Sequence, residues 1–133
     1  MKRNLMLAIT SLLSIVFVTF HLTGDTLRAR AGTPEAGGST LVAVPILVVW
    51  LYGTLVLAER RSGYVIMLIG SLIALVMPVF HVAGPEGVFR GQIAKSSGDF
   101  LFVWALHALG VTGMFSLILA ACGLLSRQRA KPQ

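Results

Sequence analysis

The sequence predicts an all-α fold, an integral membrane four-helix transmembrane bundle. Three observations carry this prediction. Of the 133 residues, 56% are hydrophobic and only 12% are charged, unlike the composition of a soluble globular domain. Four apolar stretches lack Asp, Glu, Lys and Arg, and each has about the 20 residues that a transmembrane helix needs. Basic residues flank these stretches at alternate ends. A chain of this length is expected to form a single transmembrane domain, 1–133.

The first two helices are predicted over residues 5–22 and 39–58, joined by an outer loop over 24–38. The first apolar run is longer than the about 7–15 residues of a secretory signal, so we expect it to be kept as a transmembrane helix. Pro45 interrupts the second run. A membrane helix tolerates proline because neighbouring helices can satisfy the carbonyl that it frees.

The last two helices are predicted over residues 64–83 and 100–125, joined by an outer loop over 84–98. The charged segment 59–63, which ends in glycine, is expected to form the tight turn between the two halves of the chain. Asp99 is a good N-cap for the last helix, since its carboxylate can accept hydrogen bonds from backbone N–H groups.

The two halves share a short pattern at the end of their first helix. Phe20-His21 and Phe80-His81 lie at corresponding positions, and each pair is followed closely by a glycine. This match indicates two tandem helical hairpins related by duplication. A parallel duplication would place a pseudo-twofold axis along the membrane normal.

The placement of charge predicts the orientation of the bundle. Alternation of the four helices puts one set of basic residues on a single side, with Glu59 as the only acid there: Lys2, Arg3, Arg60, Arg61, Arg127, Arg129 and Lys131. The positive-inside rule therefore predicts cytoplasmic N- and C-termini and a multi-pass protein of the inner (plasma) membrane. This rim explains the formal net charge of +6, and no basic groove with interleaved aromatics indicates a nucleic-acid partner.

The only three histidines of the chain, His21, His81 and His107, are its candidate site residues. Each is separated from a cytoplasmic arginine by about 18–20 residues, or roughly 27–30 Å of helix, so all three are predicted at one depth near the outer face. Ionisable side chains within a membrane are rare and usually functional. Small and polar residues accompany them at helical spacing, which predicts that these faces form the bundle interior and that all three histidines are buried between helices. Beside His107 this small-residue face consists of Ala108, Thr112, Ser116 and Ala120.

Two kinds of cofactor would fit these histidines. Three histidines with an open fourth position are a ligand set for catalytic zinc. Met77, one helical turn before His81, adds a weaker candidate ligand of the soft kind that suits copper. Alternatively, His21 and His81 are placed to hold haem b between two helices. No residue is predicted to be catalytic, because the spans contain no paired carboxylates and no nucleophile beside a base.

Three other residues receive packing or anchoring roles. Cys122, the only cysteine, is expected to be a small packing residue inside the last helix. Trp50 lies near the bilayer middle, where its indole N–H needs a polar partner. Trp104 is expected to anchor the outer end of the last helix at the membrane interface.

The predicted function is a small inner-membrane binding or accessory protein, whose histidine cluster holds a metal ion or haem within a redox or respiratory assembly. Two alternatives stay open: a cofactor-free structural subunit of a membrane complex, and a small homo-oligomeric transporter. The transporter would need a thin polar path lined by hydroxyl side chains: Thr10, Ser14, Thr112 and Ser116. The expected partners are the lipid bilayer, other membrane subunits or further copies of the chain. Enzymatic activity is the less favoured interpretation.

Overall fold

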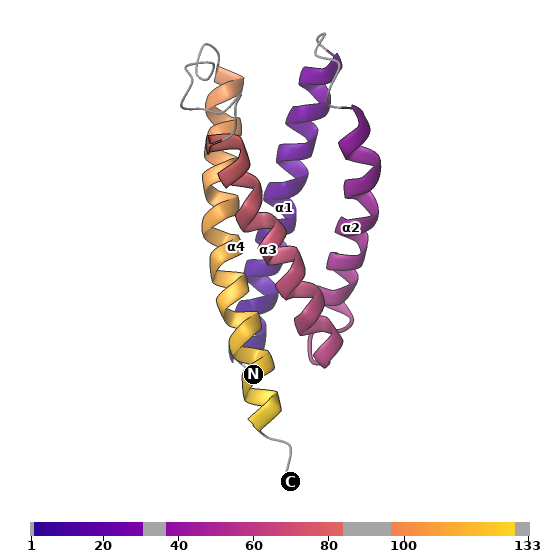
Figure 1. Cartoon of the computed structure of the whole chain (residues 1–133), viewed down its shortest axis with the longest axis vertical. Coiled ribbons are helices and arrows are strands. Elements are labelled where there is room, and N and C mark those ends of the chain that lie inside the picture. Colours follow the sequence, from indigo (N-terminus) through magenta and orange to yellow (C-terminus); the bar gives the residue numbers. More distant parts are fainter. Residues whose placement is uncertain (1, 31–36, 84–96, 130–133) are drawn as a thin grey trace.

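The structure consists of four α-helices, and the predicted all-α class is confirmed (Figure 1). The computed structural model describes the backbone of residues 2–30, 37–83 and 97–129, and the side chains of 2–24, 26, 42–80 and 103–128. The helices are α1 (Lys2–Arg30), α2 (Gly37–Leu55), α3 (Arg61–Ala83) and α4 (Ser97–Arg129). In Figure 1, α1 begins and α4 ends at the same end of the bundle, where α2 also turns into α3.

Two helices are longer than the sequence predicts. α1 continues through Arg30, and α4 begins at Ser97, so the predicted N-cap Asp99 lies inside the helix and that prediction is wrong. Residues 31–36 and 84–96, within the predicted outer loops, lie outside the described residues. Two threonines near the end of α1 satisfy their hydroxyls within the helix, by donating to backbone carbonyls of the preceding turn. Thr23 Oγ1 lies 2.8 Å from the Thr19 oxygen, and Thr26 Oγ1 lies 2.8 Å from the Thr23 oxygen.

The turn between α2 and α3 comes earlier than predicted. α2 ends at Leu55 rather than at residue 58, and α3 begins at Arg61. The Tyr52 carbonyl accepts hydrogen bonds from the N–H groups of Val56 and Leu57, at 2.9 and 3.3 Å, which closes the helix. A Cβ on Gly63 would collide with the Leu57 carbonyl, so the close approach of α3 to this turn requires glycine there.

The packing is uneven among the four helices. α4 makes the most extensive interfaces, with α3 and α1, while the interfaces of α2 with α3 and α1 are smaller. Within the described residues α2 does not contact α4, and Figure 1 shows α1 and α3 between them. The bundle is therefore a three-helix core of α1, α3 and α4 with α2 attached to its side.

Small residues line the contact between α3 and α4. A Cβ on Gly113 would lie 3.0 Å from the Ala74 Cβ and 3.3 Å from its backbone carbon. Ser116 and Ala120 on the same face of α4 are fully buried. Membrane helices pack closely through small residues because lipid offers no hydrophobic driving force between them. The predicted packing role of these two residues is confirmed.

Three of the four helices have the length and composition to cross a membrane. The qualifying segments are Lys2–Gly24 in α1, Arg61–Phe80 in α3 and Val103–Gln128 in α4. The described apolar part of α2, Val42–Leu55, is shorter. The structure thus supports an all-helical protein with three candidate membrane spans, one fewer than the sequence predicts.

Candidate functional site

The predicted site histidines do not share one environment. His21 on α1 is buried, with an exposed fraction of 1%, whereas His107 on α4 is exposed. His81 belongs to α3, but its side chain lies outside the described residues. The prediction that all three histidines are buried between helices is therefore wrong for His107.

The reason lies in the face that α4 turns inward. Its buried residues recur every three or four positions: Leu106, Leu109, Gly113, Ser116 and Ala120. His107 follows Leu106 and is therefore turned by about 100° around the helix, away from α3. Cys122 is exposed for a similar reason, so its expected place inside the helix packing is also wrong.

The exposed imidazole bonds to its own helix. His107 Nδ1 lies 2.8 Å from the carbonyl oxygen of Val103. Because a carbonyl can only accept a hydrogen bond, this contact requires the proton on Nδ1, which leaves Nε2 as an acceptor in the neutral ring. This bond fixes the orientation of the ring on the surface of α4.

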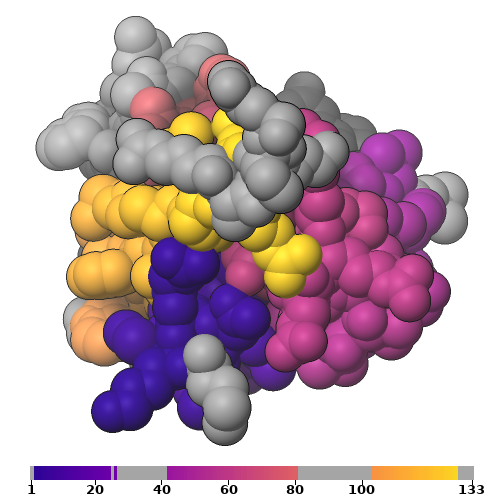
Figure 2. Space-filling model, turned by 90° about the horizontal axis from the view of Figure 1, so that it is seen from below, coloured from indigo at the N-terminus to yellow at the C-terminus, as the bar shows by residue number. Residues whose placement is uncertain are grey.

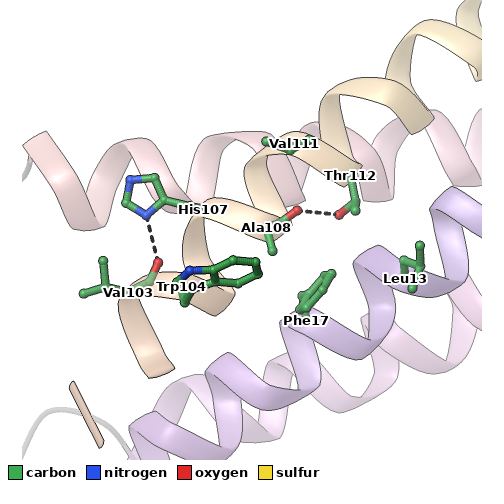
Figure 3. A pocket seen from close by; sticks show the side chains of 8 residues that line it. All are labelled: Leu13, Phe17, Val103, Trp104, His107, Ala108, Val111 and Thr112. Carbon is green, nitrogen blue, oxygen red and sulfur yellow. Dashed lines mark hydrogen bonds between the residues drawn. The ribbon is translucent and has the colours of Figure 1, made fainter. Parts of the chain in front are cut away.

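His107 stands at the edge of a groove between α1 and α4 (Figure 3). The groove has a volume of about 690 Å³, and its walls are almost entirely apolar: Leu13, Phe17, Val103, Trp104, His107, Ala108, Val111 and Thr112. The ring of Phe17 comes from α1 and the indole of Trp104 from α4. Trp104 is 63% exposed near the start of α4, and its role as an interfacial anchor stays a prediction.

Inside the bundle, hydroxyl groups hold α2 to α1. The indole N–H of Trp50 donates to Ser11 Oγ at 2.8 Å, and Ser11 Oγ lies 2.8 Å from Thr54 Oγ1. Thr54 also donates to the Trp50 carbonyl at 2.9 Å. The prediction that Trp50 finds a polar partner is confirmed. A Cβ on Gly70 would collide with the indole, so this glycine of α3 makes the room that Trp50 occupies.

Other hydroxyls link α4 to its neighbours. Ser71 and Ser116 hydrogen-bond between α3 and α4 at 2.7 Å, and Ser14 donates to Thr112 between α1 and α4 at 3.1 Å. Thr10 donates back to the carbonyls of its own helix. Of the four hydroxyls that were candidates for a polar path, those of Ser14, Thr112 and Ser116 thus link helices, whereas that of Thr10 bonds to its own backbone.

A third group of contacts joins the start of α1 to α3 and the end of α4. Tyr64 Oη donates to Asn4 Oδ1 at 2.6 Å, and the Arg127 guanidinium lies 5.3 Å from the centre of the Tyr64 ring. Arg3 Nη2 donates to Ser126 Oγ at 2.9 Å. We call these five residues the terminal clasp. Sequence reasoning did not predict it, because its partners are more than fifty residues apart along the chain.

Metal ligands are not gathered in the part of the chain that the structure describes. No group of three His, Cys, Asp or Glu side chains there is close enough to hold a metal ion. Met77 is partly buried and packs against the hydrophobic core. A zinc or copper site at His21, His81 and His107, and a haem b site at His21 and His81, stay predictions, because the His81 side chain lies outside the described residues.

The fold and these contacts define a class of protein: an all-helical bundle with three helices able to span a membrane and an apolar groove on its side. Comparison with known proteins adds no narrower class. The chain matches no protein-family model, no curated protein and no solved structure.

Proposed function

We propose that this chain is a small accessory subunit of an inner-membrane complex, without a cofactor of its own. In this proposal all four helices cross the membrane. α2 has 19 residues and so extends for about 28 Å, close to the about 30 Å hydrocarbon thickness of a bilayer. Its valine-rich outer surface, exposed in the isolated chain, is suited to lipid or to a neighbouring subunit.

The basic end of the bundle supports a cytoplasmic location for both chain ends. Lys2, Arg3 and Arg127 lie at the start of α1 and the end of α4, and Arg60 and Arg61 lie at the turn into α3. These segments meet at one end of the bundle in Figure 1. All five side chains are exposed. Their accumulation at one end is the pattern that the positive-inside rule associates with the cytoplasmic side.

The observation that carries the accessory role is the use of polar groups in the interior. Trp50, Ser11 and Thr54 satisfy one another, as do Ser71 and Ser116. These groups hold helices together and are already engaged, so they are unsuited to binding a cofactor. The apolar grooves lie on the outside, between α1 and α4 and between α2 and α3, where lipid or a partner helix would meet the protein.

The test is the composition of the complex isolated from its native membrane. Extraction in a mild detergent is expected to yield a particle that contains a different protein in fixed ratio, and its mass should exceed the 14.2 kDa of one chain. A monodisperse particle made of this chain alone would contradict the proposal. An absorption spectrum and elemental analysis of the same sample are expected to show no haem and no stoichiometric metal. A Soret band that disappears with His21→Ala would instead favour the haem site predicted at His21 and His81.

A further inference from the structure

The terminal clasp brings two arginines together from opposite ends of the chain. Arg3 donates to Ser126, the neighbour of Arg127 in sequence. Arg127 lies over the ring of Tyr64, whose hydroxyl donates to Asn4, the neighbour of Arg3. Arg3 thus contacts the sequence neighbour of Arg127, and the ring under Arg127 contacts the sequence neighbour of Arg3. The two arginines therefore share one surface at the start of α1 and the end of α4.

The same surface can be followed in Figure 2, which views the bundle from this end. The indigo atoms of α1 and the yellow atoms of α4 touch, and the magenta atoms of α3 adjoin the yellow ones. Both guanidinium groups are exposed there, together with Lys2, Arg60 and Arg61. Among the described residues, no ion pair to an acidic side chain accompanies any of them, and Glu59 is the only nearby acid in sequence.

Two like charges on one surface repel each other and favour an anion between them. The Ser126 hydroxyl contacts Arg3 and the Tyr64 ring contacts Arg127, and both groups are neutral, so they orient the guanidinium groups without neutralising them. A guanidinium binds a phosphate through two parallel N–H···O bonds, which an ammonium group cannot reproduce. No acidic side chain among the described residues pairs with these guanidinium groups. The chemistry of the surface thus favours binding of a phosphate group from outside the chain.

We infer that Arg3 and Arg127 form a binding site for the headgroup phosphate of an anionic phospholipid such as phosphatidylglycerol. The inference rests on the membrane insertion proposed above, which puts this end of the bundle at the level of the cytoplasmic headgroups. Basic clusters at the cytoplasmic ends of membrane helices recognise anionic lipids, at about 1 kcal/mol for each Lys or Arg near the surface. A phosphate bound between α1 and α4 would also reinforce the clasp, because it neutralises the repulsion between the two arginines.

The test compares two double variants that lose the same charge. The full chain and its Arg3→Gln/Arg127→Gln and Arg60→Gln/Arg61→Gln variants are placed in nanodiscs of phosphatidylcholine with a fifth of phosphatidylglycerol. Native mass spectrometry then counts the phosphatidylglycerol that each retains. Retention is expected to fall about thirtyfold in the Arg3→Gln/Arg127→Gln variant, from the loss of two cations, and much less in the Arg60→Gln/Arg61→Gln variant. Both variants keep the hydrogen bond from Tyr64 to Asn4, which holds the start of α1 to α3.

A second readout separates the site from a general effect of charge. The thermal midpoint of the wild-type protein is expected to rise when phosphatidylglycerol replaces part of the phosphatidylcholine. The Arg3→Lys/Arg127→Lys variant keeps the charge but loses the paired N–H geometry, and it should show a smaller rise. An equal loss of lipid in both glutamine variants would overturn the inference. So would a rise of the same size with free glycerol phosphate in detergent, because the anion would then come from solution.

Carbonate extraction of native membranes separates failure of this inference from failure of the proposed function. If carbonate removes the chain from the membrane, the proposed insertion is wrong. If the chain resists carbonate but all variants retain the same phosphatidylglycerol, only the lipid site is wrong.

Discussion

The two helical hairpins of this chain are built differently. α3 and α4 pack along much of their length through contacts such as Ala74 with Gly113 and Ser71 with Ser116. Among the described residues, α1 and α2 hydrogen-bond to each other through one group around Ser11 and Trp50. Most of the described side chains of α2 are exposed, with Val42 and Val48 at 60% or more.

The difference follows from the size of the side chains and not from hydropathy. All four helices are rich in apolar residues, but α4 offers glycine, serine and alanine at the positions that face α3. α2 offers mainly valine, leucine and isoleucine, which keep a neighbouring backbone at a distance. In a membrane, apolar side chains gain little by leaving lipid for a helix, so close packing depends on small residues. We therefore expect the two hairpins to respond differently to substitution.

The largest effect is expected from Trp50→Ala, because Trp50 is the main anchor of α2 and only 2% exposed. Loss of a buried aromatic side chain costs about 3–5 kcal/mol of unfolding free energy. Titration with a denaturing detergent measures this loss, and hydrogen exchange should show that α2 is released before the other helices. Tyr52→Ala, on an exposed position of the same helix, is the control and should change stability by less than about 0.5 kcal/mol. Equal losses for the two variants would contradict the anchoring role.

Gly113→Leu tests the α3–α4 hairpin. Its side chain would push against the backbone of Ala74, and overpacking of this kind costs about 1–3 kcal/mol. The same detergent titration measures the loss. Gly110→Ala is the control, because its Cβ would lie 3.5 Å from Pro78 Cγ, an ordinary contact. Alanine is the better helix former by about 0.5–1 kcal/mol, so this variant should be slightly more stable than the wild type. A stable Gly113→Leu protein would show that α3 and α4 do not need close contact.

Ser11→Ala has an intermediate expected effect. It removes the acceptor of the Trp50 indole N–H and a partner of Thr54, leaving a buried donor unsatisfied at a cost of about 1–3 kcal/mol. The loss should appear as faster hydrogen exchange in α2.

Ser71→Ala breaks a link between α3 and α4 and is expected to cost about 0.6 kcal/mol of unfolding free energy, the average for such bonds in membrane proteins. Faster hydrogen exchange in α2 of the Ser71→Ala variant would contradict the expectation that the two hairpins respond independently to substitution.

The smallest effect on stability is expected from Val44→Ala, at an exposed position of α2. Val44 is half exposed, and substitutions at such positions usually change stability by less than about 0.5 kcal/mol. Titration with a denaturing detergent at two protein concentrations measures this change in unfolding free energy. A larger loss that depends on protein concentration would mean that another chain covers this surface.

The number of helices and their approximate positions could be predicted from the sequence, because each coincides with a long apolar run. The side of each helix that faces the bundle interior could be predicted only in part. Ser116 and Ala120 were assigned to the interior correctly, but His107 was not, since both sides of α4 are apolar and periodicity alone does not distinguish them. The buried side of α4 is marked by small residues, and His107 is one position removed from the buried Leu106.

The aromatic contacts could not have been predicted from local sequence. Trp50 occupies the space left by Gly70, and Tyr64 occupies the space left by Gly123. Each of these pairs joins two helices, and only the tertiary arrangement shows which glycine faces which ring. The position of Trp50 in an apolar run predicted that its indole N–H has a polar partner. The run did not show that this partner is Ser11.

The extensive interface between α1 and α4 has a consequence for biogenesis. α1 is the first of the four helices to leave the ribosome and α4 is the last, so α1 must wait for most of the chain before its main partner exists. During that interval the Ser14 hydroxyl on α1 is without its partner Thr112 on α4. Contacts between distant parts of a chain form slowly and expose folding intermediates to misassembly. The interior of the bundle therefore stays incomplete until α4 arrives and the clasp closes.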